Sequence, residues 1–171
     1  MATPDRVAAL SEQLTHVHQA LREQLTSLRQ ETADGTGPHA ADDAIPADVL
    51  SLCLSLCTAI HTHHTGEDNQ ILPALRAAAP ELEPVIDNLI EDHALVAGIL
   101  RHIHGLLTPG RTPSSPGALT RELDGLTAIL ESHFSYEERR IAQALDTLEP
   151  SAWTADVFTT GQATDRQDTQ P

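Results

Sequence analysis

Apolar residues recur every three or four positions along four stretches of the chain, a spacing that places them on one face of an α-helix. The second stretch contains Gly66 and Pro73, where we expect a weak point or a kink. The predicted helices span about residues 4–30, 45–79, 81–107 and 118–148.

The segments between these stretches are rich in glycine and proline, which interrupt helices. They include residues 33–38 and 108–117. Four long helices with such connections predict an all-α protein, a four-helix bundle with antiparallel neighbours. We assign residues 1–150 to this single domain. Residues 151–171 are polar and rich in Thr, Asp and Gln, so we expect a flexible tail.

Composition and charge support this interpretation and exclude some classes of partner. The chain has 171 residues, enough for one core, and its 2% aromatic content favours helices over strands. Its net charge is −15, and every cation is an arginine. We therefore expect no nucleic-acid partner and no anionic membrane partner, because binding phosphates requires a cationic face. The oligomeric state is left open.

Two further features concern the compartment. The sequence has no apolar run long enough for a signal peptide or a membrane span, which predicts a cytoplasmic protein. Cys53 and Cys57 lie four residues apart in an apolar stretch, and we expect a buried reduced pair. A redox pair is the alternative, although this spacing rarely meets disulfide geometry.

The candidate chemistry is a His-x-x-x-Glu pattern that occurs in two of the predicted helices. It is formed by His63 and Glu67 in the second helix and by His133 and Glu137 in the fourth. Residues four apart share a helix face, so the imidazole and the carboxylate can meet at one site. One such pair is typical of a solvated face. Two copies inside apolar stripes indicate a common site in the bundle core.

An internal repeat connects the two copies. The second and fourth helices align without gaps at an offset of 70 residues, and the first and third align at an offset of 75, which places His18 on His93. Pseudo-twofold packing would gather four imidazoles and two carboxylates. Burying the carboxylates without a counter-charge would cost several kcal/mol each, whereas metal cations can balance them. This ligand mixture suits Fe, Mn or Zn, and two carboxylates favour a two-metal centre.

The residues that carry these patterns resemble the hemerythrin-like domains, also called HHE cation-binding domains. The run from His61 to Asp68, followed by Ile71 to Leu75, is similar to the second-helix signature of that family. The resemblance implies an up-down four-helix bundle around a non-heme di-iron centre. It makes Glu67 and Glu137 the carboxylates that bridge the metals. It makes terminal ligands of His18, His63, His93 and His133.

The chain departs from the family pattern in its third helix. Oxygen-carrying members have two histidines four apart there, whereas Ala97 stands four residues after His93. One metal is therefore expected to have one fewer protein ligand and an open coordination position. The neighbouring His64 is assigned to packing or to a place beside the ligands, because its repeat equivalent is Phe134.

The resemblance implies a protein that binds a small oxidant such as dioxygen, peroxide or nitric oxide at two iron ions, as a binder or sensor. A di-iron oxidase or peroxidase-like enzyme is one alternative, and an iron buffering protein is another. The catalytic residues of such an enzyme are unknown. Mn or Zn could replace iron. The sequence gives no nucleophile triad, phosphate loop or organic substrate.

Overall fold

The structure is a computed structural model that describes residues 9–34, 45–108 and 116–148. All regular elements in these ranges are helical, and the described residues include no β-strand. The prediction of an all-α fold is therefore confirmed. The elements are α1 (Leu10–Asp34), α2 (Ala47–Gly66), the π-helix η1 (Glu67–Ile71), α3 (Leu72–Ala78), the 3-10 helix η2 (Pro80–Leu82), α4 (Glu83–Leu107) and α5 (Pro116–Leu145).

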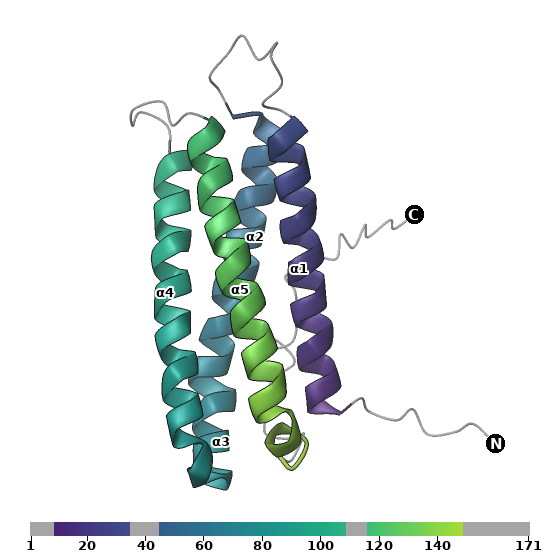
Figure 1. Cartoon of the computed structure of the whole chain (residues 1–171), viewed down its shortest axis with the longest axis vertical. Helices are drawn as coiled ribbons and strands as arrows, with labels where there is room; N and C mark the ends of the chain where they lie inside the picture. The colour runs from purple at the N-terminus through teal and green to yellow at the C-terminus, as the bar shows by residue number, and fades with distance from the viewer. Residues whose placement is uncertain (1–8, 35–44, 109–115, 149–171) are drawn as a thin grey trace, which may run out of the picture.

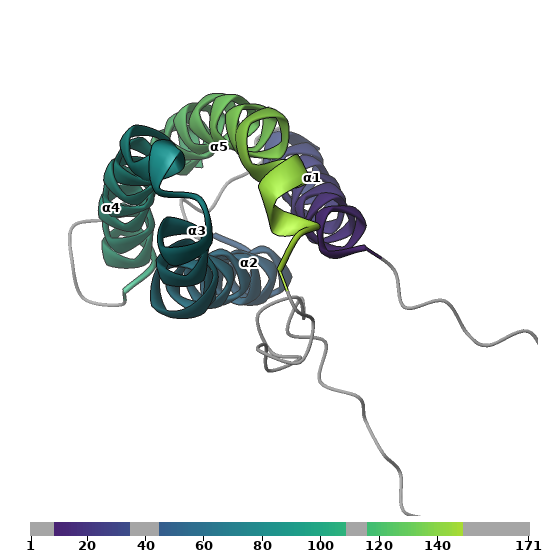
Figure 2. The same cartoon turned by 90° about the horizontal axis from the view of Figure 1, so that it is seen from below.

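Four long helical rods run antiparallel to one another in chain order. In Figure 1, α1 and α4 rise from the bottom of the view, whereas α2 and α5 descend from the top. Seen from below, α1 lies beside α2 and α5, and α4 lies beside the same two helices (Figure 2). This arrangement is the expected up-down bundle. None of the described helices is both long and apolar enough to cross a membrane.

The ends of two helices differ from the predicted bounds. Helix α1 continues to Asp34, beyond the predicted end at residue 30, and the hydroxyl of its buried Thr32 donates to the Leu28 carbonyl at 2.6 Å. Helix α5 ends at Leu145, where the N–H of Leu148 turns back to its carbonyl. Residues 4–8 and the predicted tail 151–171 lie outside the described residues.

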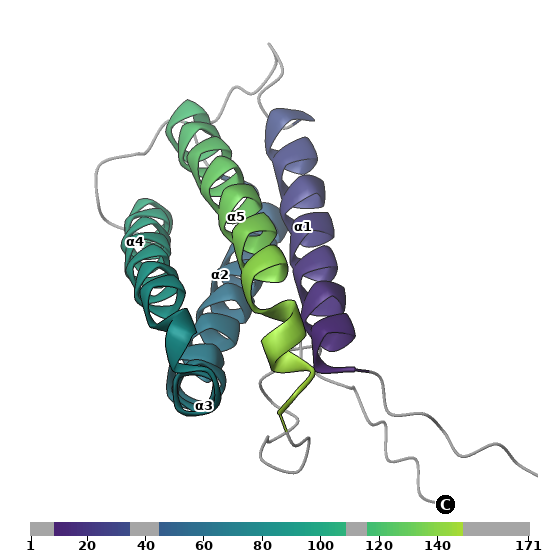
Figure 3. The same cartoon turned by 60° about the horizontal axis from the view of Figure 1, so that its bottom comes forward.

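The second rod consists of α2, η1 and α3. Its backbone hydrogen bonds change from the α-helical to the π-helical pattern where the sequence predicts a weak point. Directly after Gly66, the π-helix η1 begins with Glu67, and the Leu72 N–H donates to the Glu67 carbonyl five residues earlier. Pro73 follows and has no N–H to continue an α-helical ladder. Beyond it, α3 completes the lower end of the rod and leads through η2 into α4 (Figure 3). Single π-turns of this kind are frequent at functional sites.

Two apolar clusters form the core, one on each side of a polar layer. The larger cluster is built on all four long helices and includes Leu21, Leu56, Ile103 and Phe134. The smaller cluster includes Leu14, Ile71, Leu89 and Ile141. The layer between them contains the buried histidines and glutamates, so that any ligand in it is enclosed by aliphatic side chains at both ends.

The smaller cluster should dominate the stability of the lower end of the bundle. Leu75 is fully buried there, whereas Leu95 on α4 is 54% exposed. We expect Leu75→Ala to lower the free energy of unfolding by about 2–5 kcal/mol, because it removes apolar contacts and leaves a cavity. Leu95→Ala is the matched control and should change it by less than about 1 kcal/mol. Urea denaturation of both variants measures the difference, and equal losses would contradict this description of the core.

Candidate metal centre

The structure brings all of the sequence-predicted ligands together in the polar layer. Each of the four long rods contributes at least one of them, and their exposed fractions lie between 0% and 3%. Glu67 is the first residue of the π-helix, so the change of helical pattern starts at a site residue. The six predicted ligands are His18 from α1, His63 from α2, Glu67 from η1, His93 from α4, and His133 and Glu137 from α5.

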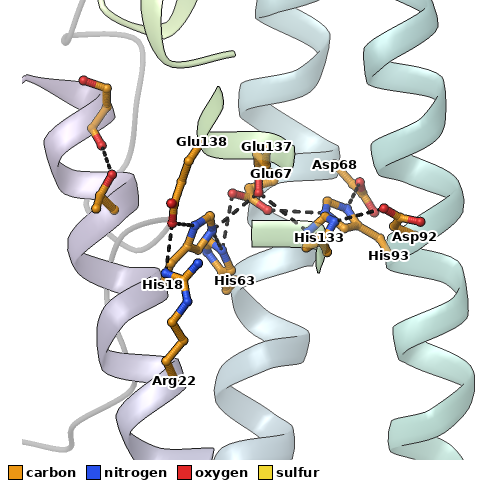
Figure 4. Close-up of polar contacts among 12 residues, drawn as sticks. His18, Arg22, His63, Glu67, Asp68, Asp92, His93, His133, Glu137 and Glu138 are labelled. Carbon is orange, nitrogen blue, oxygen red and sulfur yellow. Dashed lines mark hydrogen bonds and ion pairs between the residues drawn. The ribbon is translucent and has the colours of Figure 1, made fainter. Parts of the chain in front are cut away.

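Each carboxylate lies between imidazoles from both halves of the repeat. The Oε1 atom of Glu67 is 3.4 Å from Nε2 of His63, and its Oε2 atom is 3.5 Å from Nε2 of His93. The two glutamates occupy the middle of the layer, with histidines on either side (Figure 4).

Glu137 on α5 also lies between two imidazoles. Its Oε2 atom is 3.4 Å from Nε2 of His18 and 3.6 Å from Nε2 of His133. The geometry therefore places each carboxylate within 3.6 Å of imidazoles from both halves of the repeat.

The candidate ligand atoms fall into two groups. One contains His18, His63 and Glu67, and the other contains His64, His93 and His133. Within each group, one nitrogen or oxygen per residue lies within 4.8 Å of the others. We call them the His63 group and the His93 group.

Carboxylates outside the layer hold three of the imidazoles in place. The Nδ1 atom of His18 donates to Glu138 at 2.9 Å, and that of His93 donates to Asp68 at 2.7 Å (Figure 4). His133 Nδ1 is 3.4 Å from Asp92. A proton held on Nδ1 leaves Nε2 free as a ligand atom, the usual arrangement of metal-binding histidines.

Sequence reasoning aligned two of these outer carboxylates but gave them no role. Asp68 and Glu138 are repeat equivalents, and each reaches across to the histidine of the other half. The alignment therefore contained the signal. The alignment contained no such signal for Asp92, because its equivalent in the first helix is Val17.

The pKa shifts of the buried groups favour the binding of a cation between them. Burial, followed by the negative charge of Glu137, raises the pKa of Glu67 well above its usual value, and burial likewise raises that of Glu137. Burial and neighbouring imidazoles lower the pKa of His133 to about 3. No described arginine pairs with either glutamate, and Arg22 binds Glu131 and Glu138 instead.

Polar atoms without partners test whether a metal fits this site. When both carboxylates are ionised, the oxygens of Glu67 and Glu137 accept no hydrogen bond from the described residues. The Nε2 atoms of His93 and His133 likewise have no hydrogen-bond partner among these residues. Buried polar atoms are normally satisfied. All of these are ligand atoms for a transition metal, so the residues fit metal binding.

Two sequence features remain, the alanine at position 97 and the cysteine pair. Ala97 is partly buried and lines a surface groove between α2 and α4, together with Thr58 and His61. Cys53 and Cys57 are both free, with Cys53 buried and Cys57 partly buried.

Comparison with known proteins agrees with the geometry. A family model of the hemerythrin HHE cation-binding domain matches residues 9–145, which include every candidate ligand. Searches of curated proteins and of solved structures found no match. The match covers most of the chain, and the buried histidines and glutamates supply the donor atoms that such a domain requires. The chain therefore belongs to the hemerythrin HHE cation-binding domain family.

Proposed function

We propose that this protein is a non-heme di-iron protein that binds a small oxidant, such as dioxygen, peroxide or nitric oxide, as a binder or sensor. The observation that carries the proposal is the position of Glu67 and Glu137, each between imidazoles of both groups. The terminal ligands of the proposed centre are His18, His63, His93 and His133.

The glutamates and the outer acids would have different roles at this centre. Glu67 and Glu137 would hold the ions together with the histidines and would supply the negative charge that balances them. Glu138 and Asp68 hold the rings of His18 and His93 through Nδ1 and keep Nε2 directed inward. Two bound iron ions would supply redox chemistry and an exchangeable position for the oxidant.

Burial supports a small ligand over an organic substrate. The proposed ligands are 3% exposed or less, and apolar clusters close the layer at both ends. A diatomic molecule or peroxide can reach such a site through small fluctuations of the side chains, whereas a larger substrate would require the bundle to open. The burial favours a binder or sensor over an enzyme that acts on organic molecules.

Iron reconstitution tests the proposal directly. We expect about two ferrous ions per chain after anaerobic loading, since the site has two ligand groups joined by two carboxylates. Metal analysis should be combined with absorption spectra before and after exposure to oxygen. A reversible spectral change supports a binder, and steady consumption of oxidant indicates turnover. Trace iron after loading, or occupancy by Zn alone, would contradict the di-iron proposal.

Removing one bridging charge should have opposite effects on metal binding and on the stability of the metal-free protein. We expect Glu67→Gln to lose iron but to stabilise the apoprotein by on the order of 2 kcal/mol at pH 8, because a buried charge disappears. When folding raises the pKa of a carboxyl, the free energy of unfolding falls as the pH rises from the ordinary pKa of that group through the raised one. The gap between variant and wild type should therefore widen with pH.

Thermal unfolding of the two apoproteins from pH 5 to pH 8, with metal analysis, measures both effects. Glu91→Gln is the control, because this glutamate is exposed on α4. An apoprotein destabilised by Glu67→Gln would show that the buried carboxylate is compensated without metal.

The outer carboxylates should affect affinity without changing the number of ions. We expect Asp68→Asn to weaken iron binding about 10- to 100-fold while two ions still bind at saturation, because a neutral amide oxygen accepts the Nδ1 proton of His93 less strongly than a carboxylate. Asp92→Asn should cost less, since its oxygen is 3.4 Å from His133 Nδ1 rather than 2.7 Å. Competition with a chelator measures both affinities, and the reverse order would refute this assignment.

A further inference from the structure

His64 lies inside the polar layer, although the sequence assigns it to packing. Its side chain is 5% exposed, and its ring stacks on that of His93 with centroids 4.2 Å apart and planes 9° apart. It meets the ring of His133 edge-on at 5.1 Å. Its Nε2 atom is buried and has no hydrogen-bond partner.

We propose that His64 is a fifth histidine ligand and completes the His93 group as a three-imidazole site. It supplies from α2 the ligand that Ala97 does not supply from α4. The ligand atoms of His64, His93 and His133 already lie within 4.8 Å of one another. This inference rests on the proposed metal centre and assigns its ligands in more detail.

The internal repeat shows why packing alone does not explain His64. Its equivalent in α5 is Phe134, which stacks on His18 with centroids 4.0 Å and planes 15° apart. The two rings therefore have the same packing role, each lying flat against the histidine of the other helix pair. Phenylalanine fills this position without any polar atom, whereas His64 brings a nitrogen that has no partner in the described residues.

The energetic comparison favours a ligand. A buried polar atom without a partner is unfavourable, and a phenyl ring at the equivalent position avoids that cost. Coordination to a metal would give Nε2 of His64 the partner that the described residues do not supply, since an unprotonated imidazole nitrogen is a metal ligand.

The assignment changes which metal position is open. The His93 group gains a third imidazole, whereas the His63 group has two, from His18 and His63. The place that His64 takes in one half is taken by Phe134 in the other, and this ring has no ligand atom. The exchangeable position therefore belongs to the His63 group, beside Phe134, and the absence of a histidine at position 97 does not open the other ion.

The substitution His64→Phe separates the two roles, because it copies the ring that packs in the other half of the repeat. Wild type and variant are titrated with ferrous iron under anaerobic conditions against a chelator. We expect the wild type to bind two ions and the variant to bind one of them more than about 100-fold more weakly, beyond the loss caused by removing an outer carboxylate. Circular dichroism should show the same helix content in both proteins.

A second variant covers the case in which phenylalanine disturbs the fold. His64→Ala leaves a space next to His93, and added free imidazole should enter it and restore the affinity for the second ion. A purely structural side chain would not be replaced in this way. His16→Ala, at an exposed position on α1, is the control. Its iron affinity should equal that of the wild type and should not change when imidazole is added.

The outcomes distinguish this inference from the proposed function. Two ions bound by wild type and by His64→Phe with equal affinities, or a His64→Ala variant that imidazole does not rescue, would overturn the role of His64 and leave the di-iron centre standing. A wild type that binds no iron would overturn both.

Discussion

The burial of two carboxylates in an aliphatic bundle is the constraint on which the rest of this structure depends. Glu67 and Glu137 are fully buried, and no described arginine neutralises them. In the metal-free state their negative charges face one another, so protons or cations must take up the excess charge. Burial lowers the pKa values of His18, His64 and His133, so these imidazoles are poor counter-ions for the carboxylates.

The pseudo-twofold repeat explains how one chain builds so crowded a site. Each helix pair supplies a carboxylate that extends between both ligand groups and an outer acid that holds a histidine of the other pair. Neither pair is complete by itself. The apolar residues around the site follow the same symmetry, since Ile71 and Ile141 are both buried in the smaller cluster. Forming the site and docking the two halves are therefore one event.

The two halves of the polar layer depart from this symmetry at two places. The second rod contains a π-turn at Glu67, whereas its counterpart α5 runs as a continuous α-helix through Glu137. The repeat also places His64 in one half where Phe134 stands in the other. Two equal ligand groups would bind two equivalent ions. In the proposed di-iron centre, an asymmetric pair would allow protein ligands to saturate one ion while the other stays accessible.

The sequence by itself predicted the four helices, their antiparallel order and six of the histidines and glutamates that lie buried in the polar layer. These follow from periodicity, helix-breaking residues, i,i+4 spacing and the internal repeat, all of which can be read along the chain. The repeat even aligned Asp68 with Glu138, although their contacts were not foreseen. Only the tertiary structure decided which side chains meet across helices. The pairing of Asp92 with His133 and the stacking of His64 on His93 depend on how the packed helices are rotated about their axes. Such rotations are set by the packing of several helices at once, so no single stretch of sequence contains them.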